Sequence, residues 1–122
     1  EDAIYATKAA LKEGIVPGGG VALLNAAQEI KPNGWGEEIL LSAIKSPYHT
    51  ILENAGIENI DEPTLGQGID VTNGNVCEMV KHGIIDPVLV TKSALKNAVS
   101  VVTTIISADC VISNMRGDES SK

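Results

Sequence analysis

The chain has 122 residues, enough for one compact domain with its own core but too few for a two-domain enzyme. Its hydrophobic share of 43% and its charged share of 20% are those of ordinary globular proteins. Sixteen acidic residues against nine basic ones give a net charge of −7, and this sign argues against nucleic acid and membrane surfaces as partners. Aromatic residues make up only 2%, so we expect an aliphatic core.

The cysteines and the start of the chain bear on its compartment and completeness. Cys77 and Cys110 form no closely spaced pair, so we expect free thiols in a reducing compartment. We find no signal-peptide pattern, and no apolar run approaches the ~18 residues of a membrane span. Because the chain opens on Glu1 within a helical pattern and without an initiator methionine, we expect an excised piece of a longer intracellular protein.

The N-terminal third predicts two helices joined by a glycine turn. Apolar residues at helical spacing indicate a helix over residues 2–13, with Asp2 as its N-cap and Gly14 as its terminating residue. Pro17 and the glycines at 18–20 cannot continue this helix, so the backbone turns there. A second helix is expected over residues 21–30.

The middle of the chain predicts a long amphipathic helix over residues 37–54. Pro47 should kink it or split it in two. Residues 56–68 are too polar and too broken for a core element, and we expect a loop there. The side of the helix expected to be buried carries Ile39, Leu40, Ala43, Ile44, Ile51 and Leu52.

The last third predicts a hairpin, a long helix and a final strand. Residues 68–72 and 75–78 flank Asn73-Gly74, the dipeptide typical of a two-residue type I′ turn. Asp86 is expected to cap a core helix over residues 88–107, with Pro87 in its first turn. Residues 110–113 have strand composition and 116–122 form a polar tail. The buried face of the long helix is expected to include Leu95, Ala98, Val102 and Ile105. The fold class is therefore mainly α (α+β), with a small β-hairpin and a C-terminal strand.

The triple glycine at 18–20 has two interpretations. Glycines let backbone amides approach a ligand closely, and a helix N-terminus favours anions, so the turn could bind a nucleotide or phosphate. The alternative, which the glycines alone favour, is a tight turn between two helices. It is neither a phosphate-binding loop with a following lysine nor a dinucleotide-binding fingerprint.

Three carboxylates and two histidines are the other chemical candidates. Asp2, Asp70 and Asp86 could coordinate magnesium or polarise a water, but helix caps and turns account for them equally well. His49 and His82 lack the spacing of a metal site, so no metal ligands are expected.

Several segments, read in order, resemble the C-terminal part of a group I chaperonin, the GroEL type. The resemblance is carried by residues 1–10, by Glu13-Gly14-Ile15-Val16-Pro17-Gly18-Gly19-Gly20-Val21-Ala22-Leu23, and by the block from Gly83-Ile84-Ile85-Asp86-Pro87 to Ser93-Ala94-Leu95. It extends to about residue 115. It implies that residues 1–13 are the end of the intermediate-domain helix, 14–115 the C-terminal half of the equatorial domain, a helical bundle, and 116–122 a polar tail.

The resemblance also implies site residues. Asp2 matches the catalytic carboxylate that orients the attacking water, Gly19 a glycine beside the ribose, and Asp86 the aspartate that binds the ribose hydroxyls. The adenine edge would lie against Asp70, Val71 and Thr72. This chain departs from the family in having Asp70 where many members have asparagine, and in shortened segments at 30–37 and 56–68.

The implied cofactor is ATP or ADP with Mg²⁺, in the full-length parent only. The implied partners are other subunits of a homo-oligomeric ring, with unfolded polypeptide and a co-chaperonin bound through domains outside this chain. The fragment alone should be inactive. The bacterial cytoplasm is the expected location, with the mitochondrial matrix or plastid stroma as alternatives. Two other readings stay open: a freestanding oligomerisation module derived from an equatorial domain, and a small nucleotide-binding enzyme that uses the glycine turn.

Overall fold

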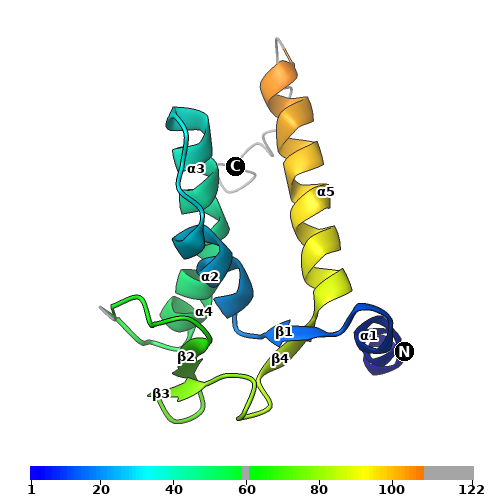
Figure 1. Ribbon diagram of the computed structural model, residues 1–122, viewed down its shortest axis with the longest axis vertical. Helices are drawn as coiled ribbons and strands as arrows, with labels where there is room; N and C mark the ends of the chain where they lie inside the picture. The colour runs from blue at the N-terminus through cyan, green and yellow to red at the C-terminus, as the bar shows by residue number, and fades with distance from the viewer. Residues whose placement is uncertain (59–60, 109–122) are drawn as a thin grey trace, which may run out of the picture. The chain divides into compact units, whose positions relative to one another are not determined.

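The computed structural model describes residues 1–58 and 61–108 (Figure 1). The chain forms two compact units, residues 1–91 and 92–122, and the division falls within the last helix. The expected strand at 110–113 and the tail at 116–122 lie outside the described residues. The elements in chain order are α1 (Asp2–Glu13), β1 (Ile15–Pro17), α2 (Val21–Glu29), α3 (Trp35–Ile44), α4 (Ser46–Asn54), β2 (Gln67–Asp70), β3 (Asn75–Glu78), β4 (Ile85–Pro87) and α5 (Val88–Ser107). The mainly helical fold class is confirmed.

Helix boundaries follow the local signals closely. Glu1, and not the expected Asp2, occupies the N-cap of α1, so that Asp2 is the first helical residue. Gly14 ends α1 with φ 90°, a conformation that glycine adopts without steric cost. The expected break near Pro47 is confirmed, because α3 ends at Ile44 and α4 begins at Ser46 with the proline in its first turn.

The expected hairpin is confirmed, but its turn is longer than a type I′ turn. Strands β2 and β3 pair antiparallel, and the last pair is Asp70 with Asn75, which leaves four residues in the loop. The amide of Gly74 donates to the carbonyl of Asp70 at 2.7 Å. The Asp70 carboxylate also binds within the loop, and these bonds favour the wider turn over the two-residue one.

A second two-stranded ladder joins distant parts of unit 1. Strand β1 pairs antiparallel with β4, with Val16 opposite Asp86 and Pro17 opposite Ile85. The expectation that Asp86 caps the long helix is therefore wrong. Residues 85–87 are extended and paired, and the helix begins only at Val88.

The core of unit 1 is small and lies between α2, α4 and the hairpin. The prediction of which residues in 37–54 are buried is only partly confirmed. Leu52 is buried, whereas Ile39, Leu40 and Ile51 are exposed. Helix α3 contains no buried residue, and Tyr48 of α4, an aromatic residue, is 1% exposed. The core residues are Val21, Leu24, Tyr48, Leu52, Ile69 and Met79.

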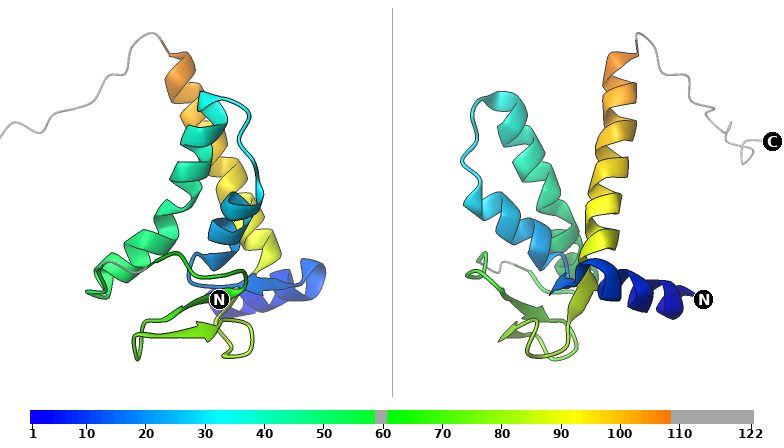
Figure 2. Two further views of the ribbon diagram at one scale, coloured as in Figure 1. Left: turned by 60° about the vertical axis from the view of Figure 1, so that its left-hand side comes forward. Right: turned by 45° about the vertical axis from the view of Figure 1, so that its right-hand side comes forward.

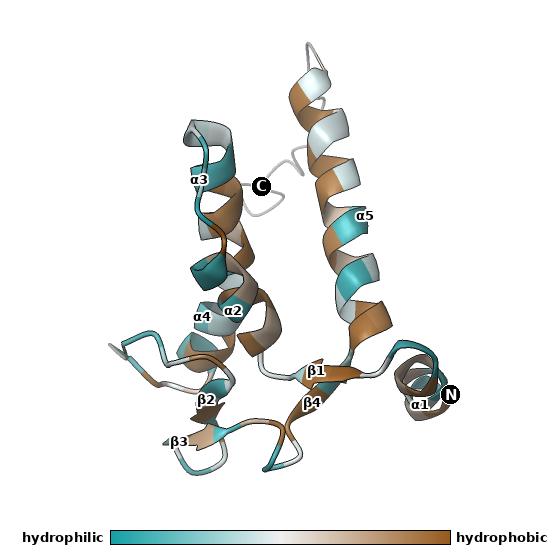
Figure 3. Ribbon diagram, in the orientation of Figure 1, coloured by the Kyte–Doolittle hydropathy of each residue, from teal (hydrophilic) through white to brown (hydrophobic). Residues whose placement is uncertain are grey.

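Helix α5, with 20 residues, is the longest in the part of the chain that the structure describes. Hydrophobic residues recur along it (Figure 3), but none of its residues is buried, and Val102 and Ile105 are about half exposed. The expectation that this helix buries Leu95, Ala98, Val102 and Ile105 is therefore wrong. Helical periodicity identifies an apolar face but not what covers it.

By length and composition α5 could span a membrane, and it is the only such helix among the described residues. This finding corrects the expectation that no segment of the chain approaches that length and hydrophobicity. Core helices of soluble proteins meet the same criterion, and Lys92 and Lys96 interrupt this one. Length and composition therefore carry no membrane assignment here.

Candidate functional site

The three glycines before α2 each lie against a different segment of the chain. A Cβ placed on Gly18 would come within 3.1 Å of the carbonyl carbon of Ile84, and one on Gly19 within 2.9 Å of the Met79 methyl group. A Cβ on Gly20 would come within 2.6 Å of the backbone nitrogen of Tyr48. Both Gly19 and Gly20 also have positive φ, at 65° and 77°. Protein packing therefore accounts for all three glycines, so their presence alone does not imply a ligand.

The glycine turn opens directly into α2. The carbonyl of Gly18 accepts a hydrogen bond from Val21, and the amide of Gly18 donates to Ile84 at 2.8 Å. The first amides of any α-helix lack partners within the helix and carry its partial positive charge. The turn thus places an anion-favouring helix end beside the β1–β4 ladder.

Asp86 lies at the centre of that ladder. Its strand partner Val16 is two residues before the first glycine of the turn. The side chain of Asp86 is exposed. The structure therefore brings two residues expected in the site, Gly19 and Asp86, onto neighbouring segments. An exposed carboxylate here is free to accept hydrogen bonds from hydroxyl groups.

The hairpin packs against the same turn. A Cβ on Gly68 in β2 would come within 2.5 Å of the Val21 side chain and 2.9 Å of the Met79 sulfur. Met79, which is 1% exposed, thus lies against both the glycine turn and the hairpin. Sequence reasoning missed this residue. The glycines at 19 and 68 signal a close approach, but nothing in the pattern identifies the partner.

The hairpin loop contains the three residues expected at the adenine edge. The Asp70 carboxylate accepts hydrogen bonds from the hydroxyl of Thr72 at 2.5 Å and from its amide at 2.9 Å. These bonds lower the pKa of Asp70, with the hydroxyl contributing most, and His82 adds a smaller electrostatic effect. Asp70 is thereby committed to its own turn, whereas Val71 and Thr72 are exposed.

Asp2 lies apart from the other candidate residues. It is exposed in the first turn of α1, and α1 meets the β1–β4 ladder at its other end (Figure 2). A helix of this length separates Asp2 from Gly14 by about 18 Å along its axis. The geometry therefore does not place Asp2 beside Gly19 or Asp86.

The thiol of Cys77 is free, as expected, and Cys110 lies outside the described residues. The Cys77 sulfur is 3.8 Å from the sulfur of Met79. Within residues 1–58 and 61–108, no group of three or more histidines, cysteines or carboxylates could hold a metal ion.

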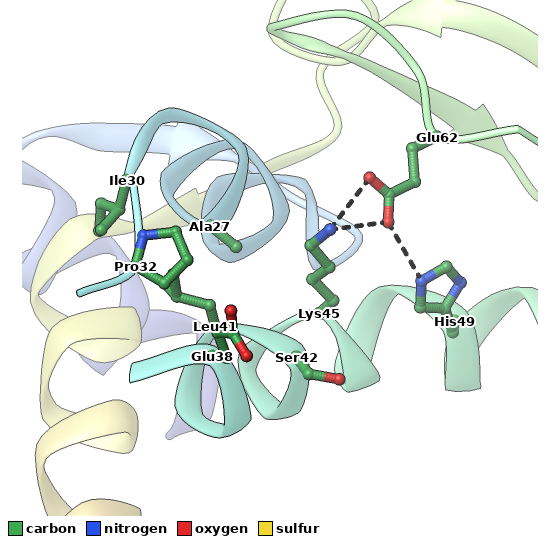
Figure 4. Close-up of a pocket in the computed structure, with 9 residues that line it drawn as sticks. All are labelled: Ala27, Ile30, Pro32, Glu38, Leu41, Ser42, Lys45, His49 and Glu62. Atoms are coloured by element: carbon green, nitrogen blue, oxygen red, sulfur yellow. Dashed lines mark hydrogen bonds and ion pairs between the residues drawn. The ribbon is translucent and has the colours of Figure 1, made fainter. Parts of the chain in front are cut away.

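A separate hollow of about 450 Å³ lies at the junction of α2, α3 and α4 with the Glu62 loop (Figure 4). At its polar end Lys45 donates to both oxygens of Glu62, at 3.0 and 3.2 Å, and Gln28 donates at 3.3 Å. The imidazole of His49 is 3.9 Å from the same carboxylate. The Lys45 hydrogen bond is the main cause of a lowered Glu62 pKa. Because Glu62 is already paired, we assign no ligand to this hollow.

The chain matches the TCP-1/cpn60 chaperonin family over residues 1–116 and belongs to this family. It is 42% identical to the mitochondrial chaperonin CPN60-1 of Cucurbita maxima, over 97% of this chain and 23% of that protein. The mitochondrial chaperonin CPN60 of Arabidopsis thaliana is also 42% identical, over 98% of this chain and 23% of that protein. The resemblance to the GroEL type is consistent with these relatives.

A solved structure described as a group III chaperonin in the open state has a similar fold, with a TM-score of 0.70. It is 25% identical and covers 85% of this chain and 25% of that one. The alignment to the Cucurbita relative spans 134 residues, more than this chain contains, so that relative carries residues which this chain lacks. The chain spans 23% of the length of the curated relatives.

Proposed function

We propose that this chain is one part of an ATP-dependent chaperonin subunit, in which it forms one side of the nucleotide site and contributes contacts within a ring. The observation that carries the proposal is the pairing of Val16 with Asp86. This pairing places an exposed carboxylate next to the glycine turn at the start of α2. A helix end that favours phosphate and a carboxylate that can bind ribose hydroxyls are then neighbours.

The residues present fit part of a nucleotide site. Gly19 and Asp86 would hold the ribose, while the exposed Val71 and Thr72 would lie at the adenine edge. The Asp70 carboxylate is bound by Thr72, so its role would be to shape the hairpin loop and not to contact the base. In many nucleotide sites Mg²⁺ is held largely by phosphates and water, which agrees with the lack of a carboxylate cluster among the described residues. Bound ATP would supply the free energy that drives the folding cycle.

Asp2 would act on the water that attacks the terminal phosphate. Its position at the outer end of α1 means that α1 must move toward the nucleotide for this role to be possible. Hydrolysis would then depend on Asp2, whereas nucleotide binding would not.

The proposed location and partners rest on the family to which the chain belongs. The named relatives are mitochondrial, so we propose the mitochondrial matrix in preference to the bacterial cytoplasm expected from the sequence. The proposed partners are further copies of the parent subunit in a ring, together with unfolded polypeptide and a co-chaperonin bound by other parts of the parent.

Asp2 and Asp86 can be separated by paired measurements on the full-length parent. Asp86→Ala should weaken ATP binding by roughly 10–100-fold, the effect of losing a charge-assisted hydrogen bond. Asp2→Ala should leave affinity unchanged and abolish most turnover. Asp61→Ala, an exposed aspartate on another loop, is the control and should alter neither. A large affinity loss for Asp2→Ala with normal turnover of bound ATP would contradict the assignment, as would unchanged affinity for Asp86→Ala.

A further inference from the structure

The Met79 side chain lies between two parts of the proposed nucleotide site. Its terminal methyl group is within 2.9 Å of the position that a Cβ on Gly19 would occupy, and its sulfur is within 2.9 Å of the same position on Gly68. Gly19 belongs to the turn proposed to hold the ribose. Gly68 lies in β2, the strand that leads into the loop proposed for the adenine edge. Met79 is 1% exposed, so it fills the space between these two backbone segments.

The backbone of Met79 connects the same parts of unit 1. Its amide donates to the carbonyl of Gly66 at 3.2 Å, just before β2 begins, and its carbonyl accepts from the amide of Ile84 at 2.9 Å. Ile84 comes directly before β4, the strand that carries Asp86, and its own carbonyl accepts from the amide of Gly18 at 2.8 Å. Met79 is therefore bonded to the segments that position the hairpin, the glycine turn and Asp86.

The two side-chain contacts of Met79 can be separated by substitution. Apart from the chain neighbours of Gly19, no other atom of the described residues lies within 4 Å of the Cβ position on that glycine. Methionine is long and unbranched, which lets it reach this far. A leucine side chain ends about where the methionine sulfur lies. Leucine would therefore keep the packing on Gly68 and lose the methyl group that reaches Gly19.

We propose that Met79 is a positioning residue, which holds the hairpin at a fixed spacing from the glycine turn and so aligns the adenine-binding and ribose-binding parts of the site. This inference rests on the proposed nucleotide site and adds the residue that joins its two parts. Met79 acts through Gly19 and Gly68, because its own side chain is buried. A ligand that spans two subsites gains from both only when their spacing is correct, and a site already held in the bound geometry loses less order on binding.

The test compares the affinities of the full-length parent and of Met79→Leu for ATP and for GTP, because these nucleotides differ only in the base. Met79→Leu should weaken ATP binding by about 3–30-fold, the range found for residues that couple two sites. GTP binding should weaken less, so the preference for ATP should shrink. A role in stability alone would not change this preference.

Leu52→Ala is the matched control for the loss of core packing. Leu52 belongs to the same core cluster and is 6% exposed, but it comes from α4 and not from the hairpin or the glycine turn. This variant should lower the unfolding temperature and leave the ratio of ATP to GTP affinity unchanged.

A second measurement tests the contact with Gly19 without any nucleotide. Gly19→Ala should lower the unfolding temperature less in the Met79→Leu background than in the parent, because the shorter side chain leaves room for the new Cβ. The backbone strain at the positive φ of Gly19 is the same in both backgrounds, so it cancels in the comparison. Equal losses would show that the Met79 methyl group moves aside freely, and they would overturn the proposal.

Failure of this inference can be told apart from failure of the proposed site. An unchanged preference for ATP in Met79→Leu, or an equal loss of preference in Leu52→Ala, overturns the positioning role alone, provided that Asp86→Ala still weakens ATP binding. If Asp86→Ala binds ATP as the parent does, or if the parent binds ATP and GTP equally, the proposed nucleotide site is wrong and the role of Met79 is overturned with it.

Discussion

The backbone nitrogen of Tyr48 occupies the space where any residue other than glycine at position 20 would place its Cβ, with a separation of 2.6 Å. The start of α4 therefore packs directly on the turn that begins α2. Because the contact involves backbone and not a flexible side chain, it cannot be relieved by a rotamer change. The Gly20–Tyr48 contact fixes the two helices against each other.

Replacing Gly20 by alanine should therefore destabilise unit 1 more than positive φ alone would. Gly66 is a matched control, because its φ of 76° is close to the 77° of Gly20 and, apart from its chain neighbours, no atom of the described residues lies within 4 Å of its Cβ position. We expect Gly66→Ala to cost about 1–2 kcal/mol from backbone strain and Gly20→Ala about 3 kcal/mol or more. Urea unfolding of both variants measures the difference. Equal losses would show that the contact with Tyr48 relaxes freely.

The buried hydroxyl of Tyr48 has no hydrogen-bond partner among the described residues. An unpaired buried hydroxyl costs stability, so Tyr48→Phe should raise the free energy of unfolding by about 1 kcal/mol. Tyr48→Ala, which removes the ring from the core, should lower it by about 3–5 kcal/mol. A loss of stability in the phenylalanine variant would mean that the hydroxyl has a partner in solution.

The same hydroxyl should make stability depend on alkaline pH. Burial, with a smaller effect of Glu62, raises the Tyr48 pKa above its ordinary value of 10.0. The unfolded state then releases this proton at a lower pH than the folded state does, so ionisation of Tyr48 leaves the free energy of unfolding unchanged well below pH 10 and lowers it as the pH rises above that value. Unfolding measured between pH 8 and pH 11 should show this fall in the free energy of unfolding. The Tyr48→Phe variant should lose less stability than the parent over the same pH range.

Glu62 should make the free energy of unfolding fall as the pH becomes acidic, whereas Tyr48 makes it fall at alkaline pH. Lys45 holds its pKa below the ordinary 4.5, so its stabilising effect is present above that value and fades as pH falls toward the folded pKa. The pair is partly exposed, which limits the effect to about 0.2–1 kcal/mol. Glu62→Gln and Lys45→Met should each remove this part of the acid dependence. If either variant retains it in full, the pairing does not persist in solution.

A charge in α5 should be tolerated better than one in the core of unit 1. Val102 is 51% exposed and Val21 is fully buried. We expect Val102→Asp to cost less than about 0.5 kcal/mol, and Val21→Asp several kcal/mol because the carboxylate would be buried without a partner. Thermal unfolding of both variants tests this. A large loss for Val102→Asp would mean that its face of α5 is covered in solution.

Local signals predicted most of the secondary structure. Pro47 marked the break between α3 and α4, Asn73-Gly74 marked the hairpin, and the spacing of apolar residues marked α5. Each of these features depends on residues close together in sequence. The family followed from the order of several motifs and is confirmed by the match over residues 1–116.

The β1–β4 ladder and the composition of the core could not be predicted in the same way. Strands of three residues give too short a pattern, and their pairing depends on partners at the far ends of unit 1. Met79 and Tyr48 enter the core because glycines let other segments come close, a relationship that the spacing of apolar residues does not encode. In the candidate site, the sequence indicated Gly19 and Asp86 but not the strand that joins them, and the roles of all six expected residues stay predictions.

The β1–β4 ladder also constrains the order in which the chain folds. Ile15 pairs with Pro87, so this ladder closes a loop that contains α2, α3, α4 and the hairpin, whereas β2 and β3 close only their own short turn. Closing a longer loop costs more chain entropy, and contacts between distant residues form more slowly. The hairpin should therefore form early, and the segment that carries Asp86 should reach the glycine turn only in the last stage of folding.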